Sequence, residues 1–274
     1  RLAHASLVDG ARLSGARLRV FPHNDVDRLD EVLRRADQRT VATTPSKKSR
    51  TLIVTESVFS MDGDLAPLSE LVAIKERYGA WLMVDEAHAT GLYGSNRTGL
   101  AEELGVADRI EVRMGTLGKA LGAAGGYICG SASLIQFLLN KARSFIFSTA
   151  PSPVAAAAAH AALAIVANAE GRQRSDRAWA NAYAVASRLK GPLPPANRFG
   201  TSRSPPSVIL PLLLGCEQRT VNAARQLLDH GVFVPPIRFP AVRRGSARLR
   251  LTVTAAHSDA DVANLLAALE SVGL

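Results

Sequence analysis

The segment WLMVDEAH, residues 81–88, joins an apolar run to an acidic end. Continuous apolar runs are typical of strands that are buried on both faces, as in a parallel sheet covered by helices. Similar runs occur at residues 51–55, 110–114 and 126–129, and residues 68–78 between the first two strands have helical spacing. The alternation of strands and helices predicts an α/β domain with a mostly parallel sheet flanked by helices.

The pattern changes after Pro153, where long helical stretches begin. We expect helices at 154–169, 177–189, 221–228 and 259–269, a loop at 191–206, and strands at 208–212, 232–234 and 247–253. Such a mixture predicts a second, smaller α+β domain. We place the boundary near residue 170, which gives a large domain at 1–170 and a C-terminal domain at 171–274.

Composition excludes several kinds of protein. The 274 residues carry a formal charge of +9, but the basic residues are dispersed and aromatic residues are only 5% of the chain, so we expect no nucleic-acid partner. No apolar run reaches the length of a membrane span, and we expect no membrane partner. Cys129 and Cys216 are far apart in sequence, which favours two free, buried thiols and a cytoplasmic location.

Two residues in loops after strands suggest a specific chemistry. Asp85 ends the run at 81–85, and Lys119 lies in GTLGKALG, residues 115–122. A carboxylate that faces a pyridinium nitrogen keeps it protonated, and a lysine amine in a tight, partly desolvated turn can form a Schiff base. This pair is what pyridoxal phosphate requires. Glu86 should point away from Asp85, because side chains alternate along a strand.

The other candidate positions have plain alternatives. Lys119 would be a solvated surface residue if its loop bound nothing. Ser60 lies in a polar loop and Ser148 and Thr149 could cap a helix, although each could also bind a ligand. Arg250 lies between apolar residues of an expected strand, where a substrate carboxylate would suit its planar guanidinium. The histidines lack the spacing of metal ligands, and we expect no metal.

Taken together, the motifs resemble those of the α-oxoamine synthases, a branch of the fold-type I pyridoxal phosphate enzymes. The segments occur in the family's order along the whole chain. They are HASLVDG at 4–10, HND at 23–25, TESVFSMDG at 55–63, VDEAH at 84–88, GTLGKALG at 115–122, SFIFST at 144–149 and RLRLTVTAAH at 248–257.

The resemblance implies roles around the cofactor ring. Lys119 would carry the cofactor as a Schiff base and later move protons at the substrate. Asp85 would pair with the pyridine nitrogen. His4 would stack on the ring beside the substrate, and His88 and Ser60 would hydrogen-bond around the phenolic oxygen.

It also implies how phosphate and substrate are held. Thr116 would bind the phosphate, with Ser148 and Thr149 reaching the site of a neighbouring subunit in a homodimer whose active site lies at the interface. Arg250 would bind the carboxylate of the amino-acid substrate.

The implied reaction is a decarboxylative condensation of an amino acid with an acyl-coenzyme A. The last segment most resembles the biotin-pathway branch, which joins L-alanine to pimeloyl-coenzyme A. Glycine-using sister enzymes and a non-catalytic partner subunit are the alternatives. Ala241 stands where the biotin-pathway branch tends to have threonine, and Ala89 where the family usually has glycine. The resemblance lacks the segments that form the N-terminal third of family members. The sequence begins at Arg1, without methionine.

Overall fold

A computed structural model describes residues 2–43, 50–189 and 203–274. These residues pack into two compact units. Unit 1 comprises residues 1–58 and 66–168, and unit 2 comprises residues 59–65 and 169–274. The short segment 59–65 therefore packs with the C-terminal part of the chain, although unit 1 surrounds it in sequence.

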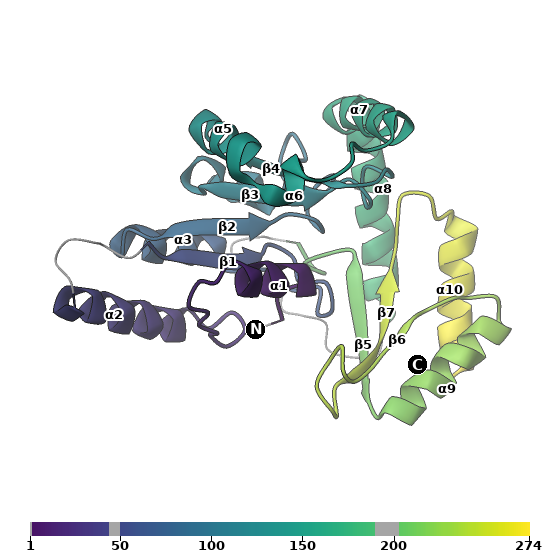
Figure 1. Ribbon diagram of the computed structural model, residues 1–274. Coiled ribbons are helices and arrows are strands. Elements are labelled where there is room, and N and C mark those ends of the chain that lie inside the picture. The colour runs from purple at the N-terminus through teal and green to yellow at the C-terminus, as the bar shows by residue number, and fades with distance from the viewer. Residues whose placement is uncertain (1, 44–49, 190–202) are drawn as a thin grey trace. The chain divides into compact units, whose positions relative to one another are not determined.

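Unit 1 is built on a four-stranded sheet in the order β1-β2-β3-β4 (Figure 1). The strands are β1 (Leu52–Glu56), β2 (Trp81–Asp85), β3 (Val112–Thr116) and β4 (Gly126–Gly130). β1, β2 and β3 pair in parallel, whereas β4 runs antiparallel to β3. The four expected strands and the mostly parallel pairing are confirmed, and β4 is the exception at one edge.

The helices of unit 1 lie before, between and after these strands. They are α1 (Ala5–Leu13), α2 (Val26–Thr43), α3 (Leu68–Arg77), α4 (Leu100–Glu103), the 3-10 turn η1 (Ala107–Arg109), α5 (Ala132–Lys141), α6 (Arg143–Ile146) and α7 (Pro153–Ala167). α3 packs against β2, and α5 packs against β4. Leu68, Leu71 and Val72 of α3 and Leu82 and Val84 of β2 are buried and form part of the core.

The β3–β4 pair contains a close contact that depends on glycine. Gly115 of β3 is paired with Tyr127 of β4. A Cβ atom at position 115 would lie 2.4 Å from the Tyr127 hydroxyl oxygen, so the tyrosine ring occupies the space of the missing side chain. The same hydroxyl is 2.8 Å from Oγ1 of Thr90. Tyr127 thus connects β4 to the segment that follows β2.

Unit 2 contains a three-stranded antiparallel sheet in the order β5-β7-β6. Its elements are α8 (Ala169–Ala186), β5 (Ile209–Gly215), α9 (Glu217–Asp229), β6 (Pro236–Ile237), β7 (Ala247–Thr252) and α10 (Asp259–Ser271). The core is formed by buried aliphatic side chains of the sheet and of α8, α9 and α10, including Leu210, Leu227, Leu249, Leu251 and Leu269. Unit 2 therefore combines a small antiparallel sheet with three helices.

Three local expectations were wrong. The strand expected at 232–234 is not formed; β6 lies at Pro236–Ile237, where it pairs with β7. The aromatic segment 145–147, whose side chains predict a strand, lies instead at the end of the helix α6, Arg143–Ile146. Cys129 and Cys216 are free, as expected, but both are exposed. Most of the expected loop at 191–206 lies outside the described residues.

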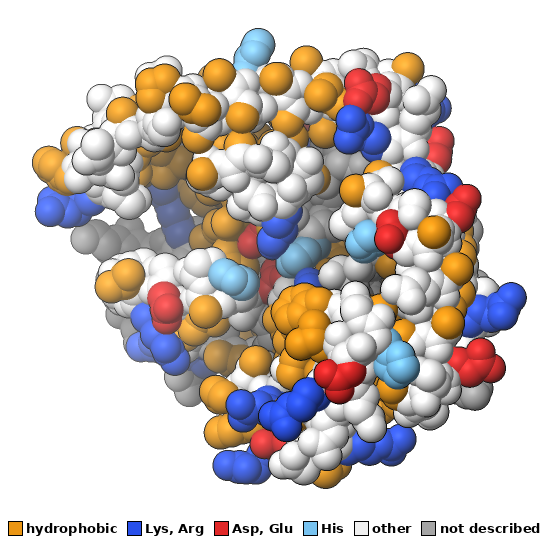
Figure 2. All heavy atoms as spheres, turned by 90° about the vertical axis from the view of Figure 1, so that its right-hand side faces the viewer, with side chains coloured by type: hydrophobic (Ala, Val, Ile, Leu, Met, Phe, Trp, Pro, Cys, Tyr) orange, Lys and Arg blue, Asp and Glu red, His pale blue; other side chains and the backbone are white. Residues whose placement is uncertain are grey.

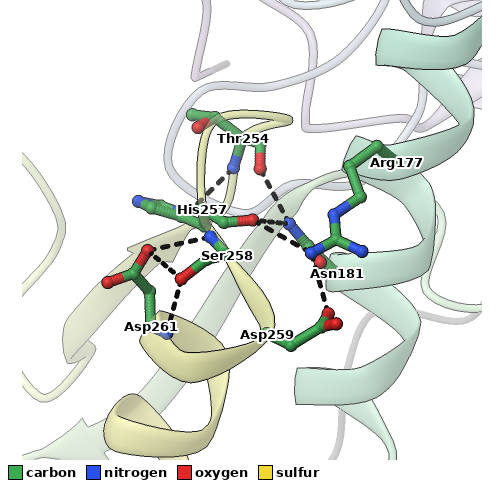
Figure 3. Close-up of polar contacts among 7 residues, drawn as sticks. All are labelled: Arg177, Asn181, Thr254, His257, Ser258, Asp259 and Asp261. Atoms are coloured by element: carbon green, nitrogen blue, oxygen red, sulfur yellow. Dashed lines mark hydrogen bonds and ion pairs between the residues drawn. The ribbon is translucent and has the colours of Figure 1, made fainter.

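The turn between β7 and α10 is held by α8 (Figure 3). The Asn181 amide nitrogen, on a side chain that is buried, donates to the carbonyl oxygens of Thr254 at 2.9 Å and His257 at 3.0 Å. Arg177, one turn earlier on α8, forms an ion pair with Asp259 at 2.7 Å. Ser258 then begins α10 with a capping box. The end of β7 is thereby fixed to the first helix of its own unit.

We expect Asn181→Ala to reduce the free energy of unfolding by about 1–2 kcal/mol, because it removes both donors to this turn. Urea unfolding followed by circular dichroism measures the change. Asn222→Ala is the matched control, since Asn222 is exposed on α9. Equal stability of the two variants would contradict a structural role for Asn181.

Candidate active site

Asp85 ends β2 and is almost completely buried, with 6% of its surface exposed. Its Oδ1 atom accepts a hydrogen bond from the backbone N–H of Ala87 at 2.9 Å. Burial raises the pKa of Asp85, and the Ala87 N–H and the charges of Lys119 and His4 counter only part of this rise. A cation near the carboxylate would favour its ionised form.

Lys119 lies in the loop that joins β3 to β4. This loop begins where β3 ends, and β3 is the strand that pairs with β2, the strand of Asp85. Its Nζ atom is 3.0 Å from Nε2 of His88, which follows Asp85 by three residues. Lys119 is exposed in this chain, whereas the sequence suggested a partly desolvated amine. The loop is a tight one: Gly122 has a positive φ of 58° and its N–H donates to the Lys119 carbonyl.

Thr116 shapes the start of the same loop. Its hydroxyl donates to the Gly125 carbonyl at 3.2 Å and accepts from the Gly118 N–H at 3.1 Å. The Leu117 N–H also bonds to the Gly125 carbonyl. These hydrogen bonds use the donors of the turn within the chain, so an anion bound here would take the Thr116 hydroxyl proton from the Gly125 carbonyl.

His4 stands at the N-cap of α1. Its Nδ1 atom accepts from the Ser6 N–H at 3.3 Å and lies 2.8 Å from the Ser6 hydroxyl. Its backbone N–H donates to the Glu56 carboxylate at 2.5 Å, which connects α1 to the end of β1. The imidazole is exposed. Sequence reasoning missed Glu56, although its place at the end of a strand was visible.

Ser148 and Thr149 are exposed in the segment between α6 and α7. The Ser148 hydroxyl bonds to the Thr149 carbonyl at 3.4 Å. Their position at the surface of unit 1 leaves both hydroxyls accessible, and their predicted role toward a neighbouring subunit stays a prediction.

Ser60 and Arg250 belong to unit 2, and the structure brings them together. Nε of Arg250 donates to the Ser60 carbonyl at 2.5 Å. Burial lowers the pKa of Arg250. Arg248, on the same face of β7, differs because it forms an ion pair with Asp62 and donates to the Met61 carbonyl. An arginine already neutralised by a carboxylate is a poorer anion receptor than one bonded to a carbonyl.

The segment after His88 is held by a second carboxylate that sequence reasoning missed. Glu102 accepts hydrogen bonds from the backbone N–H and the side chain of both Asn96 and Thr98. Burial opposes its ionisation, but these donors outweigh burial and lower the pKa of Glu102 to about 2. The four hydrogen bonds close the surface turn that leads into α4.

This shift predicts a pH dependence of stability. A carboxyl whose folded pKa is lowered stabilises the fold above its unfolded pKa of about 4.5 and loses that effect as pH falls toward 2. Wild type should therefore be more stable than Glu102→Gln at pH 6, and the gap should narrow between pH 4.5 and pH 2. Urea unfolding at several pH values measures the gap; Glu70→Gln on the exposed face of α3 is the control. A gap that does not change with pH would contradict the assignment.

Comparison with solved structures identifies the class of fold. A serine palmitoyltransferase from S. paucimobilis with bound PLP and myriocin matches with a TM-score of 0.85 and 31% identity, over 99% of this chain and 66% of that one. The Sphingomonas wittichii serine palmitoyltransferase matches with a TM-score of 0.87 and 30% identity, over 99% and 64%. An 8-amino-7-oxononanoate synthase from Francisella tularensis, at 24% identity and a TM-score of 0.76, shares the fold. The chain therefore has the fold of the fold-type I pyridoxal phosphate transferases.

The sequence comparisons then place it in a family. The model of the aminotransferase class I and II family matches residues 1–269, and the chain belongs to this family. Among curated proteins, the 8-amino-7-oxononanoate synthases of Anaeromyxobacter dehalogenans (strain 2CP-C) and Geobacter sulfurreducens are 46% and 44% identical, over 99% and 100% of this chain. The chain spans 64% and 66% of the length of these two relatives.

Proposed function

We propose that this chain is part of a pyridoxal phosphate-dependent acyltransferase of the 8-amino-7-oxononanoate synthase type. The observation that carries the proposal is the placement of Asp85, His88 and Lys119 at the carboxyl ends of two paired parallel strands. Parallel sheets bind ligands at this edge. The curated relatives named above support the particular reaction.

The residues present fit the cofactor in three respects. Asp85 is a buried carboxylate with a raised pKa, and a pyridinium nitrogen would supply the cation that favours its ionised form. Lys119 offers an accessible primary amine to attach the cofactor, with His88 at 3.0 Å. The Thr116 hydroxyl donates to the Gly125 carbonyl in this structure and would turn to the phosphate when one is bound. Ser60 and His4 would complete the set, as proposed from sequence.

The proposed reaction condenses L-alanine with pimeloyl-coenzyme A to give 8-amino-7-oxononanoate, coenzyme A and carbon dioxide. Pyridoxal phosphate, when bound, withdraws electrons from the amino-acid α-carbon and so lowers the barrier to carbanion formation. Side chains of this chain bind the substrate and transfer the proton. Arg250 binds the carboxylate of the amino acid, Asp85 keeps its charge against the ring nitrogen, and Lys119 removes and returns the proton at the α-carbon.

We further propose that the enzyme is cytoplasmic and works as a homodimer. Large apolar side chains of α5–α7 and the segments between them are exposed: Phe137, Leu139, Phe145, Ile146, Phe147, Val154 and Leu163. Figure 2 shows hydrophobic side chains gathered at the top of the view, over α7. Exposed apolar groups of this size favour a protein–protein contact. Among the described residues no single helix qualifies as a membrane span; only α7 and α8 taken together across their break meet the criterion.

Lys119→Ala should abolish the yellow colour of the protein reconstituted with pyridoxal phosphate, because it removes the amine that attaches the cofactor. Visible absorbance after removal of unbound cofactor measures the loss. Lys141→Ala is the control, since Lys141 is an exposed lysine at the end of α5. A colourless wild type, or a Lys119→Ala variant as yellow as wild type, would overturn the cofactor assignment.

Substrate choice separates the proposed reaction from its sister reactions. Alanine, glycine and serine are each supplied with pimeloyl-, acetyl-, succinyl- and palmitoyl-coenzyme A, and release of free coenzyme A is followed. We expect alanine with the pimeloyl thioester to be fastest by about tenfold or more, since a single methyl group in a fitted pocket changes specificity by that order. Fastest turnover with glycine or with serine and palmitoyl-coenzyme A would instead identify a sister acyltransferase.

A further inference from the structure

The loop between β2 and α4, residues 86–99, is held at its end by Glu102, as described above, and by one buried carboxylate, that of Glu86. Glu86 is 2% exposed. Its Oε2 accepts from the backbone N–H of Leu100 at 3.0 Å, and its Oε1 accepts from that of Ala101 at 2.9 Å. These N–H groups belong to the first turn of α4, where a helix has no carbonyl of its own to offer them. Glu86 therefore ties the first residue of the loop to the helix that follows the loop.

Gly99 makes this closure possible. Its φ is +147°, and a Cβ atom there would lie 2.5 Å from the carboxyl carbon of Glu86. The absence of a side chain at position 99 thus leaves the space that the Glu86 carboxylate fills. Burial raises the pKa of Glu86, while hydrogen bonds from Ser57, Ala101 and Leu100 and the charge of Arg113 favour its ionised form.

The closed loop carries the contacts to the Lys119 turn. His88, within the loop, has its Nε2 atom 3.0 Å from Nζ of Lys119. A Cβ atom at Gly91 would lie 2.9 Å from Cβ of Ala120, so the backbone of the loop lies directly against the residue after Lys119. A shift of the loop would therefore move His88 relative to the amine.

The backbone of Glu86 is fixed at the same place. Its N–H donates to the Met114 carbonyl of β3 at 2.8 Å, and its own carbonyl accepts from the Ala89 and Thr90 N–H groups at 2.9 Å. Thr90 also reaches Tyr127, as described above. The main chain fixes the start of the loop, and the carboxylate fixes its end.

We propose that Glu86 is a positioning residue, whose buried carboxylate closes the 86–99 loop and so sets His88 and the neighbouring Asp85 in place against Lys119 and the cofactor. The part that concerns the cofactor rests on the proposed function. The glutamate touches neither cofactor nor substrate in this proposal; it acts through the loop.

Glu86→Gln tests the idea with little change in size. The amide keeps one oxygen acceptor but puts an NH2 group against one of the two backbone N–H groups, so two donors face each other. Glu70→Gln makes the same chemical change on the exposed face of α3 and serves as the control. The protein is expressed at its natural length, and circular dichroism checks that each variant is folded.

We expect three changes in Glu86→Gln and none in Glu70→Gln. Backbone hydrogen exchange over residues 86–101 becomes faster in the cofactor-free protein. The dissociation constant for pyridoxal phosphate rises about tenfold, the order expected for one unsatisfied buried donor. The visible absorption band of the bound cofactor shifts, because His88 and Asp85 no longer face it in the same way.

Two further variants separate position from charge. Gly99→Ala leaves Glu86 intact but displaces its carboxylate, and should shift the absorption band in the same direction. Glu86→Asp keeps two oxygens on a side chain one methylene shorter, and should recover part of the affinity and part of the exchange protection. This variant also carries the test if Glu86→Gln does not fold.

The outcomes are distinct. Wild-type exchange and an unshifted band in Glu86→Gln would overturn the proposal. Faster exchange with unchanged cofactor affinity and spectrum would also overturn it, since Glu86 would then act on the fold alone. A wild type that binds no cofactor would refute the proposed function instead; the exchange rates of residues 86–101 and the NMR signals of the His88 ring in cofactor-free protein would then decide whether Glu86 positions the loop.

Discussion

The candidate site depends on the parallel pairing of β2 with β3. In this register Asp85 is opposite Met114, so the strands end close together at one edge of the sheet. One strand then supplies the buried carboxylate and His88, and the other supplies Thr116 and the loop of Lys119. Residues more than thirty positions apart meet because parallel strands share a carboxyl end. A slip of one residue would turn Asp85 to the other face of the sheet.

A buried acid at such an edge is unfavourable unless something compensates its charge. For Asp85 the compensation within the chain is partial, as its raised pKa shows. Glu86 is more deeply buried, and burial raises its pKa as well, but two backbone N–H groups donate to its carboxylate. The two adjacent carboxylates therefore differ. The Asp85 carboxylate is available to a cation, whereas the Glu86 carboxylate is hydrogen-bonded to the main chain.

The elements that sequence predicted well are those set by local pattern. The apolar runs at β1, β2 and β3 and the helical spacing of α3 are visible in a single segment. Residues 232–234 misled because their β-branched and aromatic side chains favour a strand, whereas β6 is defined by its pairing with β7. The short helix α6 was missed because Phe145, Ile146 and Phe147 have strong β-propensity. Which strands pair is decided by the whole fold and cannot be predicted from one segment.

The candidate site could be proposed from the sequence as a set of residue types but not as an arrangement. Asp85, His88 and Lys119 stood out by their motifs. The roles of the Glu86 and Glu102 carboxylates could not be predicted from the sequence, because these carboxylates bind backbone N–H groups that only a folded loop presents. Exposure of Lys119 could not be read from its small neighbours either, since exposure depends on what packs over the loop. Ser60 and Arg250 were predicted as site residues together with Asp85 and Lys119, but both belong to unit 2.

The contact between Gly115 and Tyr127 has a consequence for how such a chain can change over generations. The tyrosine ring fills the space of a side chain at position 115, and its hydroxyl reaches Thr90. A larger residue at 115 is tolerated only where the ring has already become smaller, and a smaller residue at 127 opens a void unless 115 grows. Because the two positions share one volume, we expect a change at one to require a compensating change at the other, and the order of the two substitutions then matters.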